Sequence, residues 1–243
     1  MSGHSKWSTI KRKKEKIDGN RAKIFTKIGR ELAVAVRQGG GPDPNCNFKL
    51  KDCIAKAKAL NVPNENIERI IKKAYGDSEN DKYEAITYEG YGPGGIAMIV
   101  ETLTDNRNRT AGDLRHYFDK CGGNLGSSGC VSFLFERKGL LILERANLSA
   151  DSVMENCLKA GAIDFEEDDE IFEIYTEPEN FFQIKQDLEK EGYNFISAQV
   201  ELIPTTYTNL KDEDSQIKMQ KLLDMLENND DVQNVWHNQF IES

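Results

Sequence analysis

The residues with the clearest chemical potential are cations near the N-terminus, where Lys11-Arg12-Lys13-Lys14 lies between Trp7 and Phe25. Clustered Lys and Arg bind phosphate backbones by releasing condensed counterions, and aromatic rings can stack on bases. Only three acids precede Asp43, so salt bridges could neutralise little of this charge. The alternative is a basic helix face that is merely solvated. The residues predicted to bind nucleic acid are Lys6, Trp7, Lys11, Arg12, Lys13, Lys14, Lys16, Arg21, Lys23, Lys27 and Arg30.

Charge is divided unequally along the chain. Up to Tyr75 there are 18 Lys and Arg against 7 Asp and Glu, a net charge of +11, whereas the remainder has 14 against 34, a net charge of -20. Such a dipole attracts a polyanion to one end and repels it from the other. The acidic run at 166–170 is read as a solvated turn that keeps its domain away from nucleic acid.

A second basic cluster consists of Arg107, Arg109 and Arg115. These residues flank the expected N-terminus of a helix, whose unpaired N–H groups could hold a phosphate together with the guanidinium groups. The alternative is a capped loop with solvated arginines. Both interpretations remain open, so this cluster is a candidate second phosphate contact.

The glycines at 90, 92 and 95 match the spacing of a dinucleotide-binding loop. That fingerprint requires a helix after the loop, but the segment from Ile96 to Leu103 has the composition of a strand. Pro93 also removes an N–H group from the loop. A glycine-rich turn is therefore predicted, with no dinucleotide cofactor.

Nothing in the sequence indicates an enzyme. His4, His116 and His237 are far apart, and neither a zinc motif nor a phosphate-binding loop motif is present. We therefore predict no catalytic residues, no metal, no cofactor and no small-molecule substrate. No apolar run reaches the roughly 18 residues of a membrane span. A soluble, cytoplasmic protein without a membrane partner is expected.

The first part of the chain predicts helices. Apolar residues recur at helical spacing from Lys6 to about Arg37 and again over 50–60. A third helical pattern begins near Pro63-Asn64 and is stopped by Gly76-Asp77. Glycines follow the first pattern, and Asn64 can cap the third helix. We predict a basic helical domain over residues 1–80.

Strand patterns begin after Asp81. Residues 83–89 and 96–103 predict a hairpin, and a helix through Leu114 and a strand over 131–136 follow. The next elements are then expected in the order βαββαβ, the ferredoxin-like unit: strand 140–143, helix 149–160, strands 163–165 and 171–175, helix 178–190 and strand 195–203.

The tail has one more helix around Met219 and a last strand over 232–240. Because the middle region lacks a helix and a strand, the tail is expected to return to it. The predicted fold is α+β with three domains. They are the N-terminal helical bundle, 1–80; a central α+β domain completed by the C-terminal tail, 81–138 plus 204–243; and an inserted, acidic ferredoxin-like βαββαβ domain, 139–203.

Several motifs resemble one known family. The opening Met1–Trp7 and the segment Arg21–Lys27 are similar to the start of YebC family proteins, labelled probable transcriptional regulatory proteins. Further similar segments occur in family order at 66–69, 88–95, 103–110, 122–126 and 135–139. The resemblance implies three domains, a helical N-terminal domain, no known enzymatic activity and a cytoplasmic location.

The resemblance leaves two functions open. Bacterial members carry a label of DNA-binding transcription regulators, mitochondrial relatives act as translational activators, and other bacterial members are implicated at the ribosome on proline-rich nascent sequences. The Lys-rich helix and the lack of an evident dimer element favour phosphate contact by a monomer without base readout. We expect a non-enzymatic nucleic-acid-binding regulator of transcription. The alternative is a ribosome-associated translation factor that binds rRNA and assists synthesis of proline-rich sequences.

Overall fold

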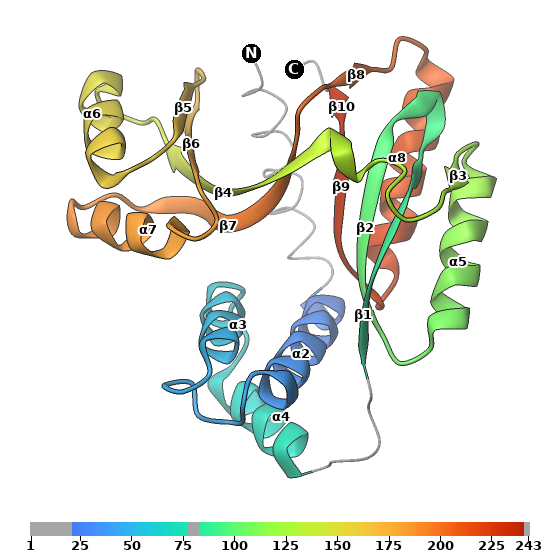
Figure 1. The fold of residues 1–243 in the computed structure, drawn as a ribbon, viewed down its shortest axis with the longest axis horizontal. Coiled ribbons are helices and arrows are strands. Elements are labelled where there is room, and N and C mark those ends of the chain that lie inside the picture. Colours follow the sequence, from blue (N-terminus) through green and yellow to red (C-terminus); the bar gives the residue numbers. More distant parts are fainter. Residues whose placement is uncertain (1–20, 77–82, 241–243) are drawn as a thin grey trace. The chain divides into compact units, whose positions relative to one another are not determined.

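A computed structural model of the protein describes residues 21–76 and 83–240 (Figure 1). Within these ranges the fold is α+β, as predicted. The described residues form two compact units. One contains residues 131–210 and 236–240, and the other contains 21–76, 83–130 and 211–235. These units do not test the three predicted domain ranges, which remain predictions.

The helical domain consists of α2 (Arg21–Gln38), α3 (Phe48–Ala59) and α4 (Asn64–Gly76). Their facing apolar residues form one core, in which Leu32 and Leu50 are fully buried. The predicted first helix is described only from Arg21 onward, and its expected portion over 6–20 lies outside the described residues.

Asn47 connects the helices of this domain through its buried amide. Its Oδ1 accepts a hydrogen bond from Leu50 N at 3.0 Å and so caps α3. Its Nδ2 donates to the carbonyls of Ala35 at 2.7 Å and Gly41 at 2.9 Å. This side chain therefore fixes where α2 ends and where α3 begins.

The central sheet begins with the predicted hairpin, in which β1 (Glu84–Tyr91) and β2 (Ala97–Thr104) pair antiparallel. The glycine-rich segment between them is a turn, with Gly94 at φ 66°. A Cβ at Gly92 would lie 2.8 Å from Met98 Sδ, so a larger residue there would have to displace this side chain. Because strand β2 follows the turn, the segment lacks the helix of a dinucleotide-binding loop.

The C-terminal tail returns to this sheet, as the fold prediction required. After α5 (Arg107–Lys120) and the short β3 (Asn124–Leu125), the sheet is completed by β9 (Val232–His237), giving the order β3-β1-β2-β9. The helix α8 (Glu213–Asn228) precedes β9 and buries its apolar face, including Met219 and Leu222.

The predicted last strand over 232–240 is interrupted at Asn238. The residues beyond it form β10 (Gln239–Phe240), which pairs parallel with β8 (Thr208–Asn209). Asn238 is buried, its backbone carbonyl accepts from Thr208 N at 2.8 Å, and its Nδ2 donates to the Thr208 hydroxyl at 3.3 Å. The strand prediction was therefore too long by the residues of this separate pair.

The ferredoxin-like order βαββαβ is present. The elements are β4 (Phe135–Glu144), α6 (Ala150–Ala160), β5 (Asp164–Glu167), β6 (Ile171–Thr176), α7 (Phe181–Lys190) and β7 (Phe195–Pro204). All neighbouring strands pair antiparallel in the order β5-β6-β4-β7. Leu141 and Phe172 on one face of the sheet pack with Val153 of α6 and Ile184 of α7.

One strand prediction in this unit was wrong. Residues 131–136 and 140–143 were expected as two strands, but β4 runs without a break through Gly139, and a 3-10 turn at Ser132–Leu134 precedes it. A Cβ at Gly139 would overlap Thr176 Oγ1 and the ring of Phe181. This glycine marks close packing within a strand, where the sequence pattern suggested an interruption.

Candidate nucleic-acid interface

The predicted basic face is only partly described by the structure. Outside the described residues lie Lys6, Trp7, Lys11, Arg12, Lys13, Lys14 and Lys16. Arg21 is the first residue of α2. The other predicted residues, Lys23, Lys27 and Arg30, lie on α2 with their side chains placed, so their surroundings can be described directly.

Two of these α2 cations, Lys23 and Lys27, contact the protein itself at the C-terminal end of α8. Lys23 Nζ donates to Asn228 Oδ1 at 2.8 Å, and Lys27 Nζ donates to the carbonyl of Glu227 at 2.8 Å. A helix end of this kind has unpaired carbonyls and partial negative charge, which favours cations. The spacing of four residues between the lysines places both on one face of α2.

Burial changes the chemistry of Lys27. Loss of solvent around its ammonium group lowers the pKa to about 8, although the nearby carboxylates of Glu227 and Asp230 act in the opposite direction. Lys23 and Arg30 on the same helix add to the lowering by charge repulsion. Lys27 thus titrates much closer to neutrality than a solvated lysine does.

Asp231 lies at the centre of a polar cluster that holds α2 to the central sheet. Arg30 Nη1 donates to its Oδ1 at 2.5 Å and to the carbonyl of Asp230 at 2.8 Å. Arg109 Nη2 donates to Oδ2 of Asp231 at 2.9 Å, and Thr110 Oγ1 donates to the same oxygen at 2.7 Å. The Asp231 side chain is only 5% exposed, so these donors replace water as its partners.

The ionised form of Asp231 is favoured despite its burial. Desolvation alone would raise the pKa of this carboxyl, but hydrogen bonds from Thr110, Arg109 and Arg30 outweigh it and lower the pKa. Hydrogen bonds to Asp231 and Asp105 raise the pKa of Arg109. The cluster is therefore a fully charged one at neutral pH.

The second predicted phosphate contact has mixed surroundings. Arg109 is held by Asp231 and, at 2.7 Å, by Asp105 although its side chain is 45% exposed, and Arg107 and Arg115 on α5 are exposed as well. The N-terminus of α5 is capped, because Asn106 Oδ1 accepts from Arg109 N at 3.0 Å. The start of α5 therefore matches the alternative prediction, a capped loop. The phosphate contact remains a prediction for Arg107 and Arg115.

A further basic surface on α3 and α4 was missed by the sequence reasoning. It comprises the exposed cations Lys49, Lys51, Lys58, Arg69, Lys72 and Lys73, and we call it the α3/α4 surface. Phe48 and Tyr75, which flank it, are 75% and 68% exposed. Exposed aromatic side chains beside lysines are the combination that binds bases and phosphates of nucleic acid. The high Lys content of residues 49–58 could have indicated this surface from the sequence. In the sequence analysis these lysines entered only the net charge.

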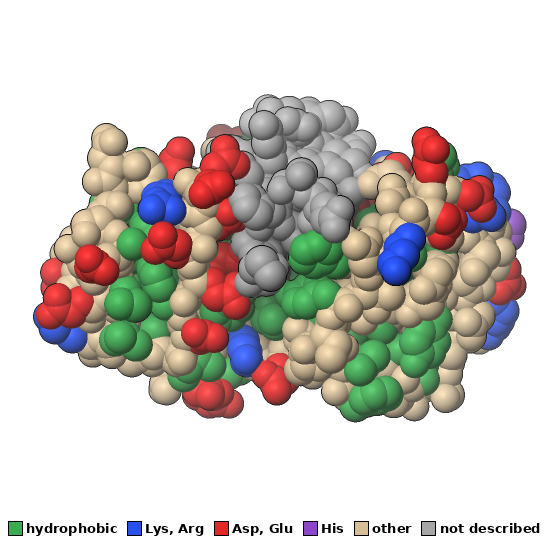
Figure 2. Space-filling model, turned by 90° about the horizontal axis from the view of Figure 1, so that it is seen from above, with side chains coloured by type: hydrophobic (Ala, Val, Ile, Leu, Met, Phe, Trp, Pro, Cys, Tyr) green, Lys and Arg blue, Asp and Glu red, His purple; other side chains and the backbone are tan. Residues whose placement is uncertain are grey.

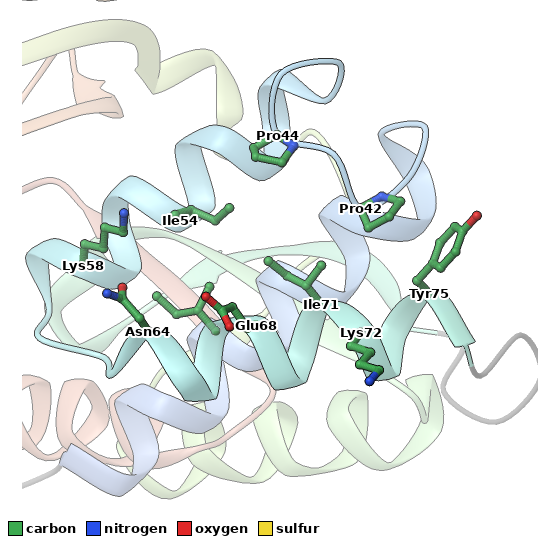
Figure 3. A pocket seen from close by; sticks show the side chains of 10 residues that line it. Pro42, Pro44, Ile54, Lys58, Asn64, Glu68, Ile71, Lys72 and Tyr75 are labelled. Carbon is green, nitrogen blue, oxygen red and sulfur yellow. The ribbon is translucent and has the colours of Figure 1, made fainter.

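A groove of about 580 Å³ runs between α3 and α4. Ile54, Ile67 and Ile71 supply apolar lining, and Glu68 is the acidic residue beside them. Figure 3 shows Lys58 near one end of this groove and Tyr75 near the other. The groove gives the α3/α4 surface a concave part with charge and an aromatic ring at its margins.

The unit with residues 131–210 has the opposite character. It contains 17 Asp and Glu against 6 Lys and Arg. Figure 2 shows acidic side chains scattered over the face of this unit that is seen there. Polyanions are repelled by such a surface, which leaves the helical domain as the candidate interface.

The described part of the chain has neither a candidate metal site nor a candidate membrane span. Over 21–76 and 83–240, no group of three or more His, Cys, Asp or Glu side chains could hold a metal ion. In the same ranges, no helix is both long enough and apolar enough to cross a membrane.

The fold and the charge distribution define an α+β protein with a basic helical domain and an acidic ferredoxin-like unit. The chain belongs to the TACO1/YebC family. Its residues 5–77 match the model of the TACO1/YebC protein N-terminal domain, and residues 83–239 match that of the TACO1/YebC second and third domain.

Similar proteins support this assignment over the full length. The chain is 57% identical to a "Probable transcriptional regulatory protein" of Acetivibrio thermocellus, with 100% of both chains covered. It is 56% identical to a protein of the same name from Caldicellulosiruptor bescii, with 98% of both covered. A crystal structure of a conserved hypothetical protein from Aquifex aeolicus matches with a TM-score of 0.83 and 45% identity, over 93% of each chain.

Proposed function

We propose that this protein is a non-enzymatic regulator of gene expression, a cytoplasmic transcriptional regulator that binds DNA as a monomer through its basic helical domain. The observation that carries the proposal is the α3/α4 surface, where two helices carry exposed lysines together with the exposed rings of Phe48 and Tyr75. The names of the relatives from Acetivibrio thermocellus and Caldicellulosiruptor bescii support the regulatory role.

The expected mode of binding is contact with the phosphate backbone. Lysines present compact charges on flexible stems, which suit contact with phosphates. Affinity should therefore depend strongly on salt and only weakly on DNA sequence. The basic run Lys11–Lys14, together with Lys58 and Lys72 beside the groove, supplies charge for this contact.

The proposal is tested by fluorescence anisotropy with a labelled duplex DNA. Changing Lys58 and Lys72 to Glu should weaken binding by about 100-fold, since two favourable phosphate contacts become repulsive. The matched control changes Lys159 and Lys190 to Glu, which alters net charge equally on exposed helix positions of the acidic unit. That control should change affinity by less than about threefold.

The predicted basic run provides a second arm of this test. Reversal of Lys11, Arg12, Lys13 and Lys14 to Glu should abolish binding and flatten its salt dependence. Unchanged affinity in both charge-reversed proteins would contradict the proposed interface. Binding that occurs only with structured ribosomal RNA, and resists duplex DNA as competitor, would replace the transcriptional proposal with the translational one.

A further inference from the structure

The α2 face formed by Lys23, Lys27 and Arg30 has the spacing of a phosphate-binding stripe, since residues four and seven apart lie along one side of a helix. In the structure this stripe is occupied by segment 227–231 of the same chain. The segment offers the Asp231 carboxylate and the backbone carbonyls of Glu227 and Asp230 to the α2 stripe. Its chemistry therefore resembles that of a nucleic-acid backbone.

We propose that segment 227–231 is an internal competitor for the α2 stripe, and that DNA gains additional phosphate contacts by displacing it. This inference rests on the proposed function and concerns its regulation. In the closed arrangement the stripe is withheld from DNA. In the open arrangement Lys23, Lys27 and Arg30 join the rest of the basic domain in binding phosphates.

Segment 227–231 also contacts β2 and α5, and these contacts would remain if α2 moved away from the segment. Arg109 and Thr110 hold the Asp231 carboxylate at 2.9 and 2.7 Å. Leu103 N donates to the backbone carbonyl of Asp231 at 2.7 Å. These groups belong to β2 and α5, so the buried carboxylate keeps partners when Arg30 leaves. Opening therefore does not leave an unpaired charge in the core.

Two features of the α2 stripe favour exchange of its contacts with segment 227–231 for contacts with phosphates. The bond between Lys23 and Asn228 is exposed, and solvent-exposed contacts of this type contribute little. Lys27 is held in a position that disfavours its charge, as its lowered pKa indicates. A phosphate with more solvent around it would accept the ammonium group at a smaller desolvation cost.

The test compares two substitutions that remove the same charge. Asp231→Asn weakens the hold on Arg30, whereas Asp119→Asn alters an exposed carboxylate on α5 that lies outside segment 227–231. Affinity for a fluorescein-labelled duplex DNA of random sequence is measured over a range of salt. If about a tenth of the protein is open, Asp231→Asn should tighten binding by up to about tenfold. Its salt dependence should also become steeper, and Asp119→Asn should change affinity by about twofold at most.

A second background separates competition from a general charge effect. With Lys23, Lys27 and Arg30 all changed to Gln, Asp231→Asn should give no gain in affinity beyond that of Asp119→Asn. Persistence of the gain there, or equal effects of both substitutions in the native background, would overturn the inference. Asn228→Ala is the milder variant for use if Asp231→Asn does not fold, and it should tighten binding about twofold. Absence of DNA binding by every variant would instead refute the proposed function, and the competitor with it.

Discussion

Replacement of Asp231 by alanine should destabilise the protein substantially, because this carboxylate receives hydrogen bonds from both α2 and the central domain. The change would leave Thr104 and Thr110 buried without their anionic partner. It would also strand the guanidinium of Arg30, whose side chain is 16% exposed.

Removing one partner of a buried ion pair costs about 3 to 5 kcal/mol. We expect the low end, about 3 kcal/mol, because the Arg109 side chain is 45% exposed and can regain water. Asp230→Ala removes the neighbouring exposed carboxylate and should cost less than about 0.5 kcal/mol.

The effect should depend on pH in a defined direction. The folded-state pKa of Asp231 lies below its unfolded value of about 3.9, so the ionised carboxylate stabilises the fold. This contribution is fully present above about pH 5 and is lost as pH falls through the folded pKa. The difference between native protein and Asp231→Ala should therefore shrink in acid.

Urea unfolding measures this difference, with Trp236 as the fluorescent reporter. The chain has two tryptophans, so a Trp7→Phe background leaves Trp236 alone. For a slope of about 2 kcal/mol per molar urea, the midpoint should fall by about 1.5 M. A loss no greater than that of Asp230→Ala, or a difference that does not diminish in acid, would refute the reasoning.

Three further predictions concern single positions. Lys27→Met should remove a rise in stability between about pH 8 and 10, because the unfolded lysine binds more protons there than the folded one, as urea titrations at several pH values would detect. Asn47→Ala should cost about 2 kcal/mol, since it removes the α3 cap and the amide donor to the carbonyls of Ala35 and Gly41; an unchanged thermal midpoint would contradict this. Gly139→Ala should cost more than about 2 kcal/mol through overlap with Thr176, measured by urea unfolding of the ferredoxin-like unit.

Much of the fold could be predicted because local patterns and tertiary packing agree. Asn64 and the apolar stripe behind it predicted α4, which begins at that residue. The missing helix and strand of the middle region predicted the return of the tail, and β9 lies beside β2. The errors arose where packing overrode a local signal, as at Gly139, which sits within β4.

The site could be predicted less well, because its contacts join residues distant in sequence. Composition identified Arg30 as a cation, but its partner Asp231 is 201 positions away. Pairing of this kind depends on tertiary structure, so the charge of α2 could not reveal which of its cations face protein. The exposed lysines at 49–58 could have been predicted from the sequence, since they lie next to the apolar residues Leu50 and Ala57, which are the buried positions of α3.

The central claim is that a basic helical domain binds nucleic acid through phosphate contacts. The most direct measurement is the affinity of the native protein for duplex DNA as a function of salt concentration. The account predicts a linear fall of log affinity with log salt, with a slope near -0.9 for each phosphate contacted, and a smaller slope after Lys58 and Lys72 are changed to Glu. A flat salt dependence, or the same slope in both proteins, would contradict it.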